Sequence, residues 1–324
     1  MKILVTGGAG YIGSVLVHKL VSLNHEVVVV DDLSTGIFKN LNSNASFIEG
    51  SITNIGILKK ALKGTDSVIH LAAKKSVEEG QLKPEYYYEQ NVEGSKALIN
   101  LCGEHNIKKF IFASTAAVYG NTEISPITEL EPAQPIGIYG KTKLEIDNYL
   151  DKFSRHLGIT SISFRFFNVI GAVQDSSKKW LEINRLSTSS LIDNVLKSSK
   201  LEPVLIYGDD WPTPDKTPIR DFVHVSDIAQ ALVLSLGNYS SLKHEVINLG
   251  TQHGYSVLDV IQTAEKALQS KVYYNFSNRR KGDIAISIAS NSKAKDKIGW
   301  EPSKNLLEAL QDSISEIEYY RKFL

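Results

Sequence analysis

This sequence contains very little cysteine and has no formal net charge. Its 324 residues include one cysteine, Cys102, so no disulfide can form within the chain. Cys102 lies among apolar residues at helical spacing in ALINLCGEHN, which indicates a core residue and not a nucleophile or a metal ligand. Lysine and arginine together number 36, and so do aspartate and glutamate. This balance argues against nucleic acid or an anionic membrane as the main partner, and no metal site is predicted.

Long hydrophobic runs are also absent. No apolar stretch approaches the length of about 20 residues that a transmembrane helix needs. The chain begins with KILVT, which predicts a strand, and lacks the charged and apolar regions of a signal peptide. We therefore expect a cytoplasmic protein without a membrane partner.

The sequence does contain a series of short apolar runs rich in β-branched residues. The runs are KILVT, EVVVV, ASFIE, SVIHLA, KKFIFAS and SISFRFF, and segments with helical apolar spacing separate most of them. This alternation predicts the βαβ units of a parallel sheet with helices on both faces. One helix is clear from the spacing of Ile146, Tyr149, Leu150, Phe153 and Leu157.

The composition and apolar pattern of the sequence change after Phe167, where irregular polar segments rich in Gly and Pro begin. A chain of this length also exceeds the usual size of a single domain. We therefore expect an α/β fold with a Rossmann-type, doubly wound parallel sheet over residues 1–170 and a smaller C-terminal substrate-binding domain over 171–324. The chain is expected to return to the first domain at about 243–268.

A glycine loop follows the first predicted strand. VTGGAGYIGSVLVHKL places Gly8, Gly10 and Gly13 in a G-x-G-x-x-G arrangement, with Gly7 in addition, before a predicted helix. Missing side chains permit a tight turn, close approach to a pyrophosphate and close helix packing, while free N–H groups and the helix dipole hold the anion. A glycine-rich turn without a ligand is the alternative, but the context favours a dinucleotide site.

Two acidic residues end the second predicted strand. Asp31 and Asp32 follow EVVV eighteen residues after Gly13, where a carboxylate can accept hydrogen bonds from an adenosine ribose. Two adjacent carboxylates would repel a 2′-phosphate. The cofactor predicted here is therefore NAD, in preference to NADP.

A Tyr-x-x-x-Lys pair lies in GIYGKTKLE, where Tyr139 precedes Lys143 by four residues. On a helix the two side chains lie one turn apart on the same face, and the apolar stripe that follows directs that face toward the sheet. A nearby ammonium, and a nicotinamide cation, would lower the pKa of the tyrosine. Such a tyrosine can take a proton from a sugar hydroxyl while hydride leaves the same carbon. Tyr239 and Lys243 share the spacing within a turn-like segment, so we interpret them as surface residues.

A hydroxyl at the end of a neighbouring strand would complete the site. KKFIFASTAAVYG places Ser114 and Thr115 at the carboxyl end of a predicted strand, where ligands bind in doubly wound folds. Capping of the strand end is the alternative for both residues. Beside the glycine loop and the Tyr/Lys pair, we interpret Thr115 as a third catalytic residue.

Together these motifs resemble the extended short-chain dehydrogenase/reductase superfamily and, more narrowly, the UDP-glucose 4-epimerase family. The resemblance covers essentially the whole chain and includes VTGGAGYIGS, FIFASTAAVYG, YGKTKLE, FRFFNVIGA, YGDDWPTPDKTPIRDFVHVSDIA, NLGT and NRRKGD. The glycine loop is common to the superfamily, whereas the segment 207–227 is typical of the epimerases.

The resemblance implies a site residue by residue. Cofactor contacts would fall on Gly7, Gly10, Tyr11, Ile12, Gly13, Asp31, Asp32, Ile52, Ala72, Ala73, Lys75, Asn91, Tyr139, Lys143 and Phe167. Contacts to a nucleotide sugar would fall on Thr115, Tyr139, Asn168, Tyr207, Arg220, Phe222, Arg280, Asp283 and Ser287. Lys75 would neutralise part of the pyrophosphate, with a solvated loop lysine as the alternative. Two arginines suit a diphosphate because each offers bidentate hydrogen bonds.

The resemblance also implies a reaction. Tyr139 would remove the proton from the sugar 4-hydroxyl, hydride would pass to NAD, the 4-keto sugar would turn over, and hydride would return to its other face. NAD would stay bound because each cycle regenerates it. The family further implies a homodimer packed through helices of the first domain.

Three positions depart from the family pattern. Ser51 replaces the aspartate that usually holds the adenine, and STSS (Ser187 to Ser190) replaces an Asn-Leu or His-Leu pair near the nucleotide. Ser287 stands where glucose-specific members carry a tyrosine, so we predict that UDP-N-acetylhexosamines are substrates beside UDP-glucose and UDP-galactose.

Other functions are open on the same fold. A dehydratase, a decarboxylase, a uronate epimerase or a ketoreductase would share the cofactor, although Ala116 and Ala117 occupy positions where a dehydratase needs acidic groups. A non-catalytic NAD(H)-sensing binder is the alternative from another class. Such a binder would have no use for Thr115, Tyr139 and Lys143 together.

Overall fold

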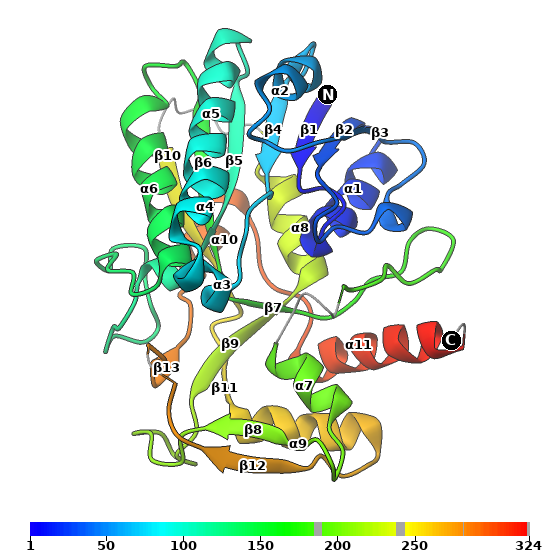
Figure 1. Ribbon diagram of the computed structural model, residues 1–324, viewed down its shortest axis with the longest axis vertical. Helices are drawn as coiled ribbons and strands as arrows, with labels where there is room; N and C mark the ends of the chain where they lie inside the picture. Colours follow the sequence, from blue (N-terminus) through cyan, green and yellow to red (C-terminus); the bar gives the residue numbers. More distant parts are fainter. Residues whose placement is uncertain (185–189, 238–243, 281, 323–324) are drawn as a thin grey trace.

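The computed structural model describes residues 1–184, 190–237, 244–280 and 282–322. Within these residues, one large sheet runs in the order β10-β6-β5-β4-β1-β2-β3, and every neighbouring pair is parallel (Figure 1). Its strands are β1 (Lys2–Thr6), β2 (Glu26–Asp31), β3 (Ser46–Glu49), β4 (Ser67–His70), β5 (Lys109–Thr115), β6 (Thr160–Phe166) and β10 (His244–Leu249). The Rossmann-type fold class predicted from the sequence is confirmed.

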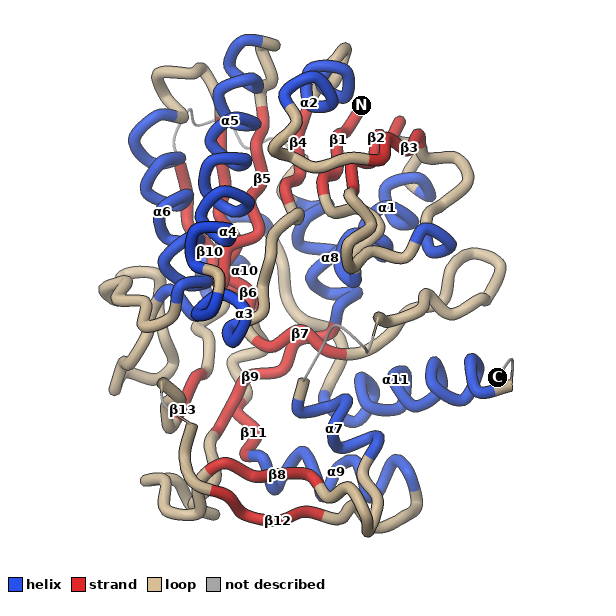
Figure 2. Tube along the Cα trace, in the orientation of Figure 1, coloured by secondary structure: helices blue, strands red, loops and turns tan. Residues whose placement is uncertain are grey.

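Helices cover both faces of this sheet because successive strand residues point to opposite sides. Ile3 and Val5 pack into one core with α1 (Tyr11–Ser22) and α8 (Val225–Leu234). Leu4, between them, packs into the other core with α2 (Ile55–Leu62), α5 (Gly94–Glu104) and α6 (Ile138–Phe153). Figure 2 shows α5 and α6 side by side along one face, with α8 on the other side of the sheet.

The helix predicted around the Tyr/Lys pair is α6. It begins directly after Gly137, so Tyr139 and Lys143 belong to its first two turns. Ile146 and Leu150 are fully buried in the core beneath it. The apolar stripe of α6 therefore fixes its rotation, and the same rotation directs Lys143 inward.

Smaller strands and helices form the lower part of the molecule in Figure 1. β9 (Ile219–His224) pairs with β7 (Asn168–Ile170), β11 (Gly254–Ser256) and β13 (Ile286–Ser287), while β8 (Val204–Tyr207) pairs with β12 (Tyr274–Ser277). A separate core forms between these strands and α7 (Leu191–Lys197), α9 (Val257–Leu268) and α11 (Leu306–Arg321). Further short helices are α3 (Val77–Leu82), α4 (Pro84–Tyr88), η2 (Glu89–Glu93), η1 (Phe38–Asn40), η3 (Ala116–Val118) and α10 (Ser292–Ile298).

The chain returns to the large sheet after residue 171. β10 pairs with β6 at the edge of the sheet, and α8 packs against α1. α9, although it lies within the expected range of 243–268, packs against α7 and α11 in the smaller core. The boundaries of the two domains stay a prediction.

Candidate active site

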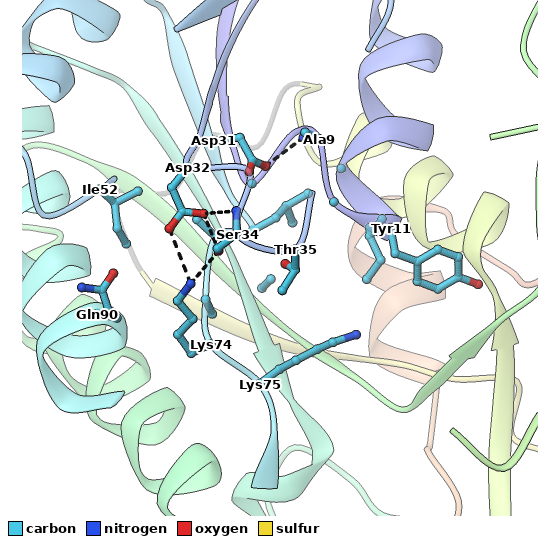
Figure 3. Close-up of a pocket in the computed structure, with 18 of the residues that line it drawn as sticks. Ala9, Tyr11, Asp31, Asp32, Ser34, Thr35, Ile52, Lys74, Lys75 and Gln90 are labelled. Carbon is cyan, nitrogen blue, oxygen red and sulfur yellow. Dashed lines mark hydrogen bonds and ion pairs between the residues drawn. The ribbon is translucent and has the colours of Figure 1, made fainter. Parts of the chain in front are cut away.

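A cavity of about 390 Å³ opens at the carboxyl ends of β1, β2, β4 and β5. β1 lies between β2 and β4, so the chain winds away from it on both sides, and a crevice forms where doubly wound folds bind ligands. Figure 3 shows Asp31, Asp32 and Ser34 on one side of this cavity, Tyr11 on another, and Lys75 reaching across it. The cavity brings together most of the cofactor residues predicted from the sequence: Gly7, Gly10, Tyr11, Ile12, Gly13, Asp31, Asp32, Ile52, Ala72, Ala73, Lys75, Tyr139 and Lys143.

The glycine loop has the close packing that its sequence predicts. A Cβ on Gly7, whose φ is +73°, would lie 2.6 Å from the amide nitrogen of Ala72 on the neighbouring loop. A Cβ on Gly13 would collide with the carbonyl oxygen of Gly7. At Gly10 the contact is looser, and α1 begins after it without a side-chain cap. The N–H groups at the start of a helix suit an anion.

Asp31 and Asp32 have different surroundings. Asp31 is buried, and its carboxylate accepts hydrogen bonds from the backbone N–H groups of Ala9 and Leu33, both at 2.9 Å. Burial raises the pKa of Asp31 despite these bonds. Burial also disfavours the charge on Asp32, but hydrogen bonds from Ser34 and the Lys74 ammonium outweigh it and lower the pKa of Asp32. Each Asp31 oxygen keeps a lone pair for a further donor, such as a ribose hydroxyl.

The loop after β4 is held from behind by Asn91. Its side chain accepts a hydrogen bond from the N–H of Lys74 at 2.8 Å and donates to the carbonyl of Lys74 at 2.9 Å. The same amide donates to the hydroxyl of Thr142 on α6. Asn91 is 2% exposed and does not line the cavity, so the structure shows it as the support of the cofactor loop.

Lys143 is buried beside the cavity. Its ammonium donates to the carbonyl of Ala113 at 2.7 Å and lies 4.6 Å from the centre of the Phe112 ring and 5.9 Å from that of Tyr139. Burial lowers the pKa of Lys143 to about 7, and the charge of Asp147 opposes the shift. Lys143 therefore titrates near neutral pH.

The expected low pKa of Tyr139 is not found. Burial raises its pKa to about 12, although a hydrogen bond with the Thr115 side chain acts in the opposite direction. The expectation is not met because burial of the phenol outweighs the hydrogen bond with Thr115. The structure does bring Tyr139, Lys143 and Thr115 together at the junction of β5 and α6.

A buried ion pair lies directly behind this cluster. Asp147, one helical turn after Lys143, accepts hydrogen bonds from Arg165 at 3.2 Å and from the Ser114 hydroxyl at 3.0 Å. The Arg165 guanidinium lies 4.7 Å from the centre of the Tyr119 ring. Asp147 thus connects α6, β5 and β6. Sequence reasoning missed this role, although the i, i+4 spacing from Lys143 was visible.

His70, at the end of β4, is neutral and fully buried. Burial lowers its pKa to about 3, and the Lys143 charge adds to the shift. Its ring nitrogens contact the Thr6 hydroxyl at 2.6 Å and the Ser95 hydroxyl at 2.8 Å. Because Ser95 itself donates to the carbonyl of Asn91, His70 donates to Ser95 and accepts from Thr6. The histidine thereby joins β1, the strand before the glycine loop, to the start of α5.

The substrate residues predicted from the sequence lie mainly around β9 and β13. The Arg280 guanidinium lies 3.6 Å from the centre of the Tyr207 ring. Burial lowers the pKa of Arg220, and the charge of Asp283 opposes the shift. Ser287 is buried on β13, where it pairs with Arg220. These residues do not line the 390 Å³ cavity, and their role in binding stays a prediction.

Three further predicted residues lie elsewhere. Asn168 is exposed on β7, where it pairs with Phe222. The Phe222 side chain packs into the smaller core and lines a second cavity, of about 190 Å³, with His253 and Lys304. Phe167 is buried in a separate small cluster, and its neighbour Phe166 lines the first cavity instead.

Some of the sequence predictions fall outside the described residues: Tyr239, Lys243 and positions 187–189. Ser190 is described and caps α7 by accepting a hydrogen bond from the N–H of Asp193. Ser51 contacts Thr53 at 2.9 Å and Gln90 at 3.4 Å at the adenosine end of the cavity.

Several residues that line the first cavity were not predicted: Ser34, Thr35, Ile37, Lys74, Gln90, Glu182, Ile183 and Asn184. In the part of the chain that the structure describes, no cluster of three or more potential metal ligands occurs. None of the described helices is long and apolar enough to cross a membrane.

Comparisons with known proteins agree with this geometry. Residues 3–250 match the profile of the NAD dependent epimerase/dehydratase family. The chain is 38% identical over 312 residues to the UDP-glucose 4-epimerase of Corynebacterium glutamicum, with 96% of this chain and 93% of that protein covered.

Solved structures are similar over the whole chain. A UDP-glucose-4-epimerase from Stenotrophomonas maltophila with bound NAD and formylated UDP-arabinopyranose superimposes with a TM-score of 0.93 at 31% identity, covering 100% of both chains. A UDP-N-acetylglucosamine 4-epimerase from Methanobrevibacter ruminantium in complex with UDP-N-acetylmuramic acid superimposes with a TM-score of 0.85 at 30% identity, covering 98% of both chains.

Proposed function

We propose that this chain, which belongs to the NAD dependent epimerase/dehydratase family, interconverts the two C4 epimers of a UDP-hexose. The observation that carries the proposal is the cluster of Tyr139, Lys143 and Thr115 at the end of a dinucleotide cavity. An acid/base pair beside a nicotinamide site permits removal and return of a hydride at one sugar carbon.

The cavity fits NAD in its shape and its charges. The glycine loop leaves space beside the amide groups of α1, and Lys75 supplies a cation that reaches across the cavity (Figure 3). Asp31 lies at the end of β2, where an adenosine ribose would place its hydroxyls. When bound, NAD supplies the acceptor and later the donor of the hydride.

Tyr139 would carry the proton in both directions. It would take the proton of the sugar 4-hydroxyl as the 4-keto sugar forms, and return it after the sugar has turned over. Thr115, which hydrogen-bonds Tyr139, would orient the same hydroxyl. A charged Lys143 would stabilise the phenolate, and Asp147 supplies the negative charge that favours a charged Lys143.

Recognition of the nucleotide is assigned to the second half of the chain. Arg220 and Arg280 would hold the diphosphate, since guanidinium groups bind phosphate oxygens in a bidentate manner. Ser287 would face the sugar 2-substituent and leave room for an N-acetyl group. Support for this substrate range comes from the small buried Ser287 on β13 and from the likeness to a UDP-N-acetylglucosamine 4-epimerase.

A homodimer is also part of the proposal. Tyr88, Lys96, Tyr149 and Glu145 form a continuous polar and aromatic surface across α4, α5 and α6, which suits a partner of the same kind. Analytical ultracentrifugation tests the dimer. A cytoplasmic location stays a prediction, which cell fractionation tests.

Two alternatives remain distinguishable by assay. Another reaction of the family, such as dehydration, decarboxylation, uronate epimerisation or reduction, would yield a different product. A non-catalytic NAD(H)-sensing binder would bind the nucleotide sugar without turnover. Ala116 and Ala117 follow Thr115 in η3, so no acidic side chain stands next to Thr115 in the sequence for a dehydration step.

Proton NMR of the purified protein tests the proposal. The protein is incubated with UDP-galactose and, separately, with UDP-N-acetylgalactosamine, with no cofactor added, and the anomeric signals of the 4-epimers are followed. Conversion of both sugars supports the reaction, the retained NAD and the open pocket at Ser287. Conversion of UDP-galactose alone would restrict the substrate range, and no conversion even with added NAD would contradict the function.

A further inference from the structure

One segment from the second half of the chain borders the cofactor cavity. Glu182, Ile183 and Asn184 line the same cavity as the glycine loop and Asp31. Figure 1 shows the green segment between β7 and α7 running outward between the dark blue elements of the first domain and the red α11. We call residues 182–184 the strap.

The strap is attached to the first domain by a buried asparagine. The Asn40 side chain donates to the carbonyl of Glu182 at 2.7 Å and accepts from the N–H of the same residue at 2.9 Å. Asn40 is 2% exposed, and it does not line the cavity. One amide therefore satisfies both backbone groups of a residue 142 positions away, as a strand neighbour would.

Asn40 is itself held in place by contacts within the first domain. The His18 ring on α1 contacts the carbonyl of Asn40 at 3.0 Å, and Asn42 contacts the other ring nitrogen at 3.1 Å. Nearer the cavity, the N–H of Ile37 donates to the carbonyl of Ala9 in the glycine loop at 2.9 Å. The loop that carries Asn40 is thus rigidly joined to the phosphate-binding end of the site.

The other contacts of the strap join it to the first domain and to α11. The Asn184 side chain donates to the carbonyl of Thr35 at 3.0 Å, next to the adenosine end. The N–H of Ile183 donates to the Glu316 carboxylate on α11 at 3.0 Å, and Glu316 is 2% exposed. Lys39 forms an ion pair with Glu182.

We propose that Asn40 is a positioning residue that holds the strap against the cofactor cavity and thereby slows the release of NAD. The proposal rests on the proposed function, because it concerns the cofactor of that reaction. A cofactor that each cycle regenerates gains nothing from leaving, and a segment that borders the cavity and is attached to the first domain and to α11 obstructs the exit of a dinucleotide until it detaches. Asn40 contributes two of the hydrogen bonds that resist detachment.

Asn40→Ala tests this role, with Asn44→Ala as the matched control. Asn44 lies on the same loop, and its side chain is exposed. Each variant is loaded with NADH and mixed with excess NAD, and the loss of bound NADH fluorescence gives the release rate. We expect release on the order of tenfold faster for Asn40→Ala, because both backbone groups of Glu182 lose their partner. Asn44→Ala should release NADH like the wild type.

Turnover separates a positioning role from damage to the fold. With saturating NAD present, Asn40→Ala should epimerise at a rate within about twofold of the wild type, since retention and chemistry are separate steps. If Asn40→Ala does not fold, Asn184→Ala removes the contact with Thr35 from the surface side and should also accelerate release.

If Asn40→Ala and Asn44→Ala release NADH at equal rates, while the wild type is active and retains its nucleotide, the role of Asn40 is overturned but the proposed function is not. A wild type that neither retains NADH nor converts a UDP-sugar would overturn the proposed function as well. The two failures are therefore distinguishable.

Discussion

The carboxylate of Asp147 lies 3.2 Å from the guanidinium of Arg165, and both groups are buried behind the catalytic cluster. Asp147 belongs to α6, one turn after Lys143, whereas Arg165 belongs to β6. The pair joins a helix to a strand and places a negative charge close to an ammonium that has lost its hydration. This arrangement gives Asp147 a role in both stability and proton chemistry.

Asp147→Asn should lower both the stability and the activity of the protein. Arg165 would be left buried without a counter-charge, which costs about 3–5 kcal/mol of the free energy of unfolding. The negative charge of Asp147, which raises the pKa of Lys143, would also be lost. The neighbouring groups Arg165, His70 and Tyr139 carry no negative charge at neutral pH that could replace it. The fraction of charged Lys143 then falls, so the alkaline limb of the pH profile of kcat should move to lower pH.

Urea unfolding and the pH profile of kcat from pH 5 to 9 measure the two effects of Asp147→Asn. Asp151→Asn, at an exposed position on the same helix, is the control. An unchanged pH profile in a variant that is merely less stable would show that Asp147 acts on the fold alone.

Lys143→Met should strongly reduce turnover and yet stabilise the fold. Burial lowers the pKa of Lys143 from 10.5 to about 7, so between these values the unfolded chain binds more protons than the folded one. The free energy of unfolding of the wild type therefore rises with pH from about 7 to 10.5, and the cost of burying the charged ammonium is fully present below pH 7. Methionine carries no charge and avoids this cost. We therefore expect the variant to be more stable than the wild type by about 1 kcal/mol or more at pH 7.

Thermal melts of Lys143→Met across pH 6 to 10 check this prediction, with Lys141→Met on the exposed side of α6 as the control. The difference in stability from the wild type should shrink as the pH rises. A variant that is less stable than the wild type at pH 7 would contradict the buried position of the ammonium. Turnover should fall by about 10² to 10⁴, as for the loss of an acid/base group.

Ser287→Tyr should remove activity on UDP-N-acetylhexosamines selectively. A phenol ring at this buried position would fill the space that an N-acetyl group needs, and overpacking of this kind costs about 1–3 kcal/mol, or roughly tenfold to a hundredfold in rate. The ratio of kcat/KM for the acetamido sugar to that for UDP-galactose measures the effect. Ser287→Ala keeps the space and should leave the ratio unchanged. Parallel loss of both activities in Ser287→Tyr would argue against the assigned pocket.

Asp32→Asn should relax the preference for NAD over NADP. The Lys74 ammonium lies 3.5 Å from the Asp32 carboxylate, so loss of the charge frees a cation for a 2′-phosphate and removes a repulsive anion. The ratio of the two dissociation constants, measured by fluorescence titration with NADPH and NADH, should shift toward NADPH on the order of tenfold. Glu49→Gln, at the end of the neighbouring β3, should leave the ratio unchanged.

The parts of the site that the sequence predicted well are those with local causes. The spacing of Gly7, Gly10 and Gly13 predicted the phosphate loop, and a Cβ on Gly13 would collide with the carbonyl oxygen of Gly7 within the same strand, turn and helix. The apolar stripe after Tyr139 predicted α6 and its rotation. Alternation of apolar strands and helical segments predicted the parallel sheet.

Other features depend on residues that are far apart in the chain. The pKa of Tyr139 was expected to be low from its neighbour Lys143, but burial by the surrounding elements raises it. Asn91, whose contact with the cofactor stays a prediction, forms two hydrogen bonds that support the loop at Lys74. Neither result follows from spacing, because desolvation and support come from residues that approach only in the folded chain.

The sequence by itself determined the sheet, the glycine loop and the Tyr/Lys pair, because periodicity and glycine placement act over a few residues. Only the tertiary structure decided that Asp147 pairs with Arg165 and that Asn40 holds Glu182 over a separation of 142 positions. Such contacts form between surfaces that separate elements bring together. Their partners are selected by the packing of α6 on β6 and of the strap on the first domain, which no local pattern encodes.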